Sequence, residues 1–114
     1  MRLSALARAI NGVSLRGDRD AAIRAVTNDS RAVVPGALYA ALPGEHVDGH
    51  EFVEDAIRAG ATGILCSTPP RRIPPGVGVI VAEWPRLSLS EISHVFHDRP
   101  SEKLRVLGIT GTDG

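Results

Sequence analysis

Two short polar clusters carry most of the side chains that could do chemistry. The first polar loop is Asn28, Asp29, Ser30 and Arg31, and the second polar loop is residues 43–49, PGEHVDG. A serine hydroxyl donates one hydrogen bond and a guanidinium can donate two in a fork, so Ser30 and Arg31 suit a phosphate group. Asp29 could instead shape its turn by accepting a backbone N–H.

The last residues have the pattern with which a phosphate-binding loop begins. Thr110, Gly111, Thr112, Asp113 and Gly114 follow an apolar segment, and glycines let backbone N–H groups curl round phosphate oxygens. The strict motif also needs a glycine where this chain has Ile109, and a lysine after the last glycine. The pattern alone therefore leaves an ordinary turn as open as a nucleotide loop.

Histidine spacing does not predict a metal site. His46 and His50 are four residues apart, and His94 and His97 are three apart, which are spacings that zinc sites use. Because no third ligand cluster accompanies either pair, we predict no bound metal.

A buried strand is predicted between the two polar loops. Residues 37–42, ALYAAL, form a short apolar run flanked by turn residues, which is typical of a strand inside a sheet. This strand should hold the polar loops apart at its two ends, on the rim of the sheet, where α/β proteins usually bind ligands. An ordinary strand with two solvated turns is the alternative.

The remaining pattern alternates helices and strands. Asp48 with Glu51, and Ser88 with Glu91, have the spacing of helix-capping boxes, and the proline-rich residues 67–76 are expected to form a loop. The order predicts an α/β fold, a mixed β-sheet with covering helices in a single small domain. Further strands are expected at 22–27, 62–66, 77–82 and 104–109, and helices at 3–10, 48–59 and 88–97.

Composition excludes several classes of protein. The 114 residues carry 13 basic and 13 acidic side chains, so no field for nucleic acid or membrane is implied. No segment has the length of a membrane span or a signal peptide, and we expect a cytoplasmic protein. The single cysteine, Cys66, should be buried and inert. Trp84 should pack in the core, although it could stack on a ligand base.

Taken together, the motifs resemble the N-terminal domain of the Mur ligases. Within that family they resemble most the ligase that adds the third amino acid of the peptide. The resemblance covers nearly all of residues 22–114. It rests on VTNDSR at 26–31, PGALYAALPG at 35–44, DGHEF at 48–52 and GITGTDG at 108–114.

The resemblance implies a three-domain, ATP-dependent amide ligase of peptidoglycan synthesis. Its substrate would be UDP-N-acetylmuramoyl-L-alanyl-D-glutamate, activated as an acyl phosphate and attacked by meso-diaminopimelate or L-lysine. Residues 1–98 would bind the UDP end of this substrate. Residues 99–114 would be a hinge, a strand and the start of the ATP-binding loop of a central domain, which this chain lacks together with the C-terminal domain.

The resemblance also assigns roles to single residues. UDP would be contacted by Asn28, Ser30, Glu45, His46 and Val47. Asp29, Arg31 and Asp48 would shape the loops or meet phosphate. Gly111, Thr112, Asp113 and Gly114 would begin the ATP loop, whereas the lysine and the Mg²⁺ ligands would lie in the absent domains, so this segment should hold no cofactor and catalyse nothing alone.

Two alternatives stay open. The same domain occurs in the ligase that adds D-alanyl-D-alanine, although Thr110, Gly111 and Thr112 favour the tripeptide-forming enzyme. A non-enzymatic module that binds a nucleotide sugar is the other.

Overall fold

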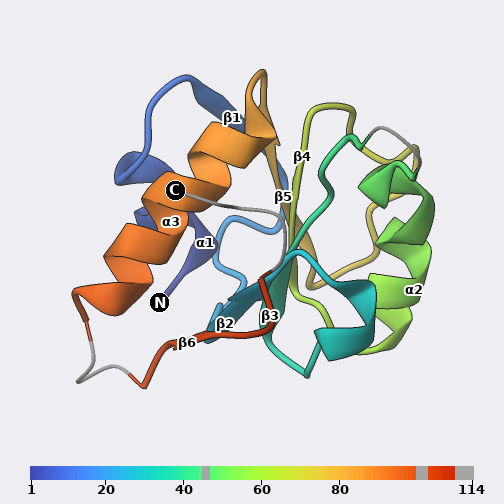
Figure 1. The fold of residues 1–114 in the computed structure, drawn as a ribbon. Helices are drawn as coiled ribbons and strands as arrows, with labels where there is room; N and C mark the ends of the chain where they lie inside the picture. Colours follow the sequence, from blue (N-terminus) through green and yellow to red (C-terminus); the bar gives the residue numbers. More distant parts are fainter. Residues whose placement is uncertain (45–46, 100–102, 110–114) are drawn as a thin grey trace.

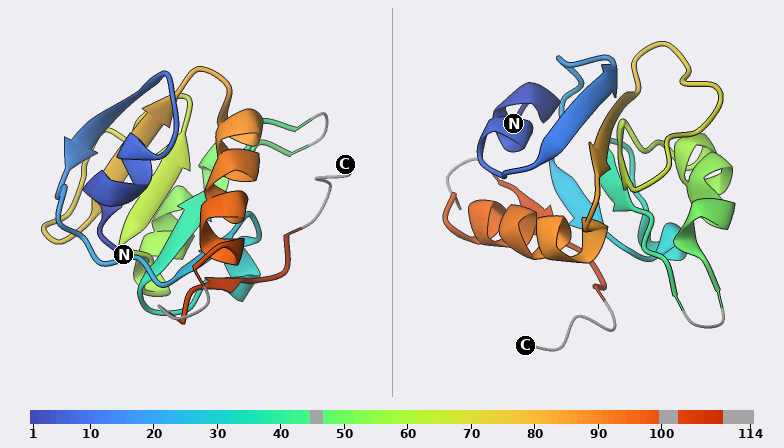
Figure 2. Two further views of the ribbon diagram at one scale, coloured as in Figure 1. Left: turned by 90° about the vertical axis from the view of Figure 1, so that its left-hand side faces the viewer. Right: turned by 90° about the horizontal axis from the view of Figure 1, so that it is seen from above.

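The protein is a three-layer α/β domain built on one six-stranded sheet. The computed structural model describes residues 1–44, 47–99 and 103–109. One pair of helices covers one face of the sheet, and a third helix with the proline-rich loop covers the other (Figures 1 and 2). The predicted mixed sheet with covering helices is confirmed.

The sheet has one antiparallel edge. Its strand order is β1-β5-β4-β3-β2-β6, and all neighbours pair in parallel except β1, which runs antiparallel to β5. The strands are β1 (Val13–Gly17), β2 (Ala25–Thr27), β3 (Ala37–Ala40), β4 (Gly63–Cys66), β5 (Gly78–Ala82) and β6 (Arg105–Val106).

Burial on both faces explains why the central strands are continuous apolar runs. In β3, Leu38 and Ala40 belong to the core under α1 (Leu3–Arg8) and α3 (Pro85–His97). Tyr39 and the following Ala41 belong to the core under α2 (Val53–Arg58). This alternation is the two-residue period of a strand. The predicted strand between the polar loops is therefore confirmed and sits in the middle of the molecule.

Two short 3₁₀ helices lie next to the polar loops. The first, η1 (Ser30–Ala32), follows the end of β2, and Asp29 is its N-cap residue. The second, η2 (Gly49–Phe52), is capped by Asp48 and runs directly into α2. Gly60, which follows α2, has a φ of 108°, a left-handed conformation that favours glycine at a helix end.

One strand was missed, one helix start was misplaced, and the strand predicted at 104–109 is reduced to the two residues of β6. Strand β1 was missed, although Val13, Ser14, Leu15 and Arg16 alternate apolar and polar residues as a half-buried edge strand does. Helix α3 begins at Pro85 rather than at Ser88, because proline is well suited to the first helical position, where its missing N–H is not needed. The Ser88–Glu91 capping box is therefore wrong.

The proline-rich segment is a loop without regular structure between β4 and β5, as predicted. Its Ile73 packs against the same core as α2. None of the helices in residues 1–44, 47–99 and 103–109 combines the length and the apolar composition of a membrane span.

Candidate functional site

Both polar loops lie at the same edge of the sheet. The first polar loop follows β2 and the second follows β3, and these two strands are parallel, with Val26 opposite Leu38. Their carboxyl ends therefore meet on one rim, where ligands of α/β sheets bind. The expectation that the strand at 37–42 holds the loops apart at its two ends is wrong, because the chain returns through η1 to the far end of the sheet before β3 begins.

Hydrogen bonds within the first polar loop fix its shape. The Asp29 carboxylate accepts from the Arg31 backbone N–H at 2.9 Å, and from Nε and Nη2 of the Arg31 guanidinium at 3.1 Å each. The buried Thr27 hydroxyl accepts the Asp29 N–H at 3.0 Å. Hydrogen bonds from the Arg31 side chain and backbone lower the pKa of Asp29. Asp29 thus forms the Asx-turn that the sequence allowed, and Arg31 is paired with it.

Ser30 is the first residue of η1, and its side chain and that of Asn28 are half-buried at the rim. A hydroxyl there can donate to a phosphate oxygen, and an amide carries both a donor and an acceptor. The loop therefore presents neutral hydrogen-bonding groups beside a carboxylate whose charge is already balanced by a guanidinium.

The second polar loop is closed at its base on β3. The Gly49 N–H donates to the Leu42 carbonyl at 2.8 Å, and the Tyr39 hydroxyl donates to the Gly49 carbonyl at 2.9 Å. A Cβ on Gly49 would lie 2.6 Å from the Leu42 nitrogen, so the close approach requires glycine. Glu45 and His46 lie outside the described residues, and Val47 is exposed.

His50 links this loop to the next strand. Its Nδ1 lies 2.6 Å from Oδ1 of Asp48, and its Nε2 accepts from the backbone N–H groups of Ser67 and Thr68 at 3.2 and 3.3 Å. Asp48 also accepts the His50 N–H at 3.0 Å, and these hydrogen bonds lower the pKa of its carboxyl group. Sequence reasoning considered His50 only as a metal ligand, because its partners Ser67 and Thr68 are seventeen and eighteen residues away.

The buried Tyr39 connects the two loops electrostatically. Burial, and then the nearby charges of Asp29 and Asp48, raise the pKa of its phenol to about 12. The carboxylate of Asp29 in the first polar loop and that of Asp48 in the second therefore both act on the Tyr39 hydroxyl. A tyrosine in an apolar strand was a signal for this contact, because a buried phenol needs a hydrogen-bond partner.

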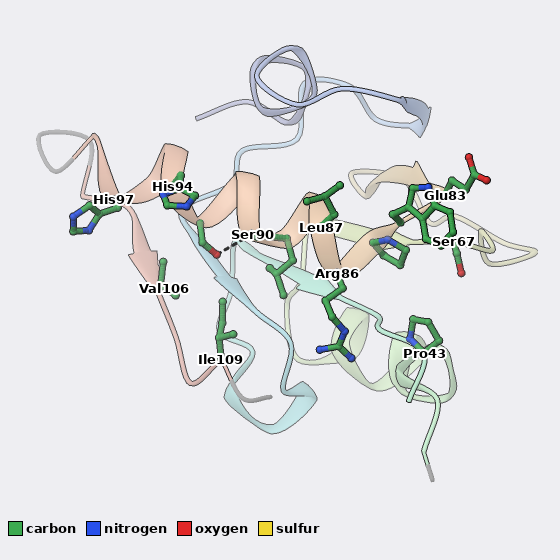
Figure 3. A pocket seen from close by; sticks show the side chains of 14 residues that line it. Pro43, Ser67, Glu83, Arg86, Leu87, Ser90, His94, His97, Val106 and Ile109 are labelled. Carbon is green, nitrogen blue, oxygen red and sulfur yellow. Dashed lines mark hydrogen bonds between the residues drawn. The ribbon is translucent and has the colours of Figure 1, made fainter. Parts of the chain in front are cut away.

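A broad groove runs beside the site along α3. It encloses about 1130 Å³ and is largely apolar. Figure 3 shows His94 and His97 toward one end, Glu83 and Ser67 toward the other, and Val106 and Ile109 across from the helix. Pro43 of the second polar loop lines it, whereas no described residue of the first polar loop does. The groove and the second polar loop are thus adjacent.

Trp84 is not the packing anchor that was predicted. It is 67% exposed and lines this groove just before α3 begins. Pro85 fixes the start of the helix, so the indole is left outside the core.

Three further predictions concerned Cys66, a metal site and the ATP loop. Cys66 is buried in β4, as predicted, and burial raises the pKa of its thiol to about 11. In the described segments, no group of three or more His, Cys, Asp or Glu side chains could hold a metal ion. The expected ATP-loop residues, Gly111, Thr112, Asp113 and Gly114, lie outside the described part.

The fold defines a class of α/β domain whose candidate ligand site is the rim at the carboxyl ends of parallel strands, and sequence similarity defines the family. The profile described as "Mur ligase family, catalytic domain" matches residues 22–98. This chain belongs to the Mur ligase family.

Relatives of known name are similar across most of the chain. A UDP-N-acetylmuramyl-tripeptide synthetase of Borreliella burgdorferi is 41% identical over 88% of the chain and 20% of its own length. A UDP-N-acetylmuramoyl-L-alanyl-D-glutamate–2,6-diaminopimelate ligase of Chlorobaculum tepidum is 42% identical over 98% of the chain and 21% of its own length. The chain thus spans about a fifth of the length of these relatives.

Solved structures share the fold. A crystal structure of MurF from Acinetobacter baumannii superposes with a TM-score of 0.70 at 22% identity, covering 88% of this chain and 21% of that one. MurF from Thermotoga maritima in complex with ADP gives a TM-score of 0.57 at 22% identity over 72% of this chain and 18% of that one.

Proposed function

We propose that this chain is the UDP-binding domain of a Mur ligase that adds the third amino acid to UDP-N-acetylmuramoyl-L-alanyl-D-glutamate. The observation that carries the proposal is the meeting of both polar loops on one rim of the sheet, at the ends of the parallel strands β2 and β3. The names of the relatives at 41% and 42% identity support this ligase.

Ser30 is the proposed direct ligand of the diphosphate, with Asn28 beside it. Asp29 and Arg31 shape the loop instead, because the carboxylate and guanidinium are already joined by two hydrogen bonds of 3.1 Å. Glu45, His46 and Val47 complete the site from the second polar loop. Asp48 holds the base of this loop through its hydrogen bonds to His50.

The chemistry of the parent enzyme needs more than this segment. ATP and Mg²⁺ would be held by the loop that starts at Gly111, Thr112, Asp113 and Gly114 and by the central and C-terminal domains of the parent protein. Residues 1–98 would be the binding domain and residues 99–114 the connection to the central domain. The proposed role of the segment is to bind and orient one end of the substrate, without catalysis of its own.

The ligase that adds D-alanyl-D-alanine is the second candidate, since the MurF structures share this fold. Their 22–23% identity supports the fold alone. The non-enzymatic alternative is tested by the codons that follow Gly114 in the gene. Lys-Thr there supports a ligase, whereas a stop codon contradicts it.

The binding role is tested by isothermal titration of the chain with UDP. Replacing Ser30 with alanine removes one hydrogen bond to a charged acceptor and should weaken binding roughly tenfold, about 1.5 kcal/mol. Ser14→Ala is the matched control. Ser14 is exposed on β1, the outer strand that three other strands separate from β2. Equal affinity in the Ser30→Ala variant and the control would remove Ser30 from the site.

A further inference from the structure

The groove along α3 gathers most of the large apolar side chains that lie exposed on the described residues. Five such side chains are exposed in residues 1–44, 47–99 and 103–109, and three of them line this groove. They are Trp84, Leu87 and Val106, which are 67%, 60% and 46% exposed. Single exposed apolar residues are normal on a protein surface, but several that gather in one hollow mark an interaction site.

Helix α3 has two faces with different surroundings. Its core face includes Leu89 and Phe96, which are buried against the sheet. Its second face includes Leu87, Ser90 and His94, which follow one another at helical spacing and line the groove. In the described part of the chain these three residues are exposed. The core therefore accounts for only one of the two faces, and the apolar Leu87 lies on the other.

The opposite wall of the groove is an edge of the sheet. Val106 belongs to β6, the outer strand, and Ile109 follows it along the same wall (Figure 3). Strand β6 pairs with β2, and among the described strands none pairs with its other side. Natural proteins usually cover such an edge, because its unpaired backbone groups and apolar side chains invite contact. An apolar groove and an uncovered strand thus lie together.

The lengths of the relatives indicate what covers this surface. The chain spans about a fifth of the two ligases to which it is 41% and 42% identical, so most of their polypeptide lies outside this domain. Since Ile109 lies in the groove wall, polypeptide that follows it in a longer parent is tethered beside the groove. A tether raises the effective concentration of a partner, whereas a separate protein or a second copy must offset its lost translational freedom.

We propose that the α3 groove is a docking surface for the polypeptide that follows residue 114 in the parent ligase, which inserts an apolar ridge between α3 and β6. Trp84, Leu87 and Val106 would be buried by this contact. The proposal rests on the proposed function in one respect, that the parent is a longer ligase, but not on the binding of UDP. Contacts of this kind between parts of one chain fix the orientation of a domain.

The test compares this chain with the full-length parent protein by hydroxyl-radical labelling and mass spectrometry. We expect Trp84 to be labelled in the chain and protected severalfold in the parent. Leu87→Glu places a charge in the contact, where its burial is costly, and should restore the labelling of Trp84 in the parent. Val34→Glu is the matched control, because Val34 is also exposed, at 42%, but lies outside the groove. Both substitutions replace exposed side chains, so both variants should fold.

Three results would overturn the proposal. Equal labelling of Trp84 in the parent and in the chain would show that nothing docks there. Protection in the chain alone, together with a dimer in solution, would make a second copy the occupant. Protection in the parent that appears only with UDP-N-acetylmuramoyl-L-alanyl-D-glutamate would assign the groove to the substrate. A UDP titration of the same parent protein keeps the two proposals apart, since absent UDP binding contradicts the proposed function and leaves the protection of Trp84 unaffected.

Discussion

The Tyr39 hydroxyl donates to the Gly49 carbonyl across 2.9 Å, so the centre of the sheet holds the base of the second polar loop. The phenol is buried, with the carboxylates of Asp29 and Asp48 close enough to raise its pKa. Tyr39 of β3 is thereby hydrogen-bonded to the second polar loop and feels the charge of Asp29 in the first.

Tyr39 should ionise far above the range of an ordinary tyrosine. It is the only tyrosine in the chain, so a spectrophotometric titration reports this side chain alone. The raised pKa of about 12 means that the neutral phenol stabilises the fold fully below pH 10, the approximate unfolded value, and that this contribution is lost as the pH rises through 12. A midpoint near 10 in the folded protein would contradict the buried hydrogen bond.

Protonation of Asp29 and Asp48 at low pH should weaken the hydrogen bonds that shape the two polar loops. Both carboxyl groups have a lowered pKa in the fold, so their contribution is present above the unfolded value of about 3.9 and is lost as the pH falls through the lower folded values. Amide shifts of Arg31 and His50, which donate to these carboxylates, should therefore each show a transition below about pH 4. In the Asp29→Asn control, the Arg31 transition should disappear while that of His50 remains.

Cys66 should be unreactive until the protein unfolds. It is the only cysteine, it is fully buried in β4, and its thiol has a pKa raised to about 11. Because the thiolate is the reactive form, a thiol reagent at pH 8 should label it only in denaturant. Stoichiometric labelling of the native chain would show that β4 is not buried as described.

Trp84 provides a test of where UDP binds. It is the single tryptophan, and its exposed ring in the α3 groove should be readily quenched by acrylamide. If UDP binds at the polar loops as proposed, it should leave the fluorescence of Trp84 unchanged. Quenching that saturates with UDP would instead support stacking of the base on this indole.

The sequence alone was sufficient to predict the strands that are buried on both faces of the sheet. The runs that became β3, β4 and β5 are apolar on both faces, so their composition alone marks them as strands. Strand β1 carries the opposite pattern, with exposed Ser14 and Arg16, so its composition does not mark it as a buried strand. The start of α3 was misplaced because the Ser88–Glu91 spacing was interpreted as the cap, whereas the helix begins at Pro85.

The arrangement of the site depended on facts that local patterns do not contain. Residue types pointed to both polar loops, but only the parallel pairing of β2 with β3 brings them to one rim. The role of His50 was missed for the same reason. Its partners, Ser67 and Thr68, belong to a loop beyond α2 and β4, and no spacing rule links them.

The central claim is that both polar loops bind UDP, and a backbone amide shift map of the chain titrated with UDP tests it most directly. We predict shifts that saturate together and cluster in Asn28, Ser30 and Arg31 and in Glu45, His46 and Val47, with β1 unaffected. Shifts confined to the α3 groove, or none at millimolar UDP, would contradict it.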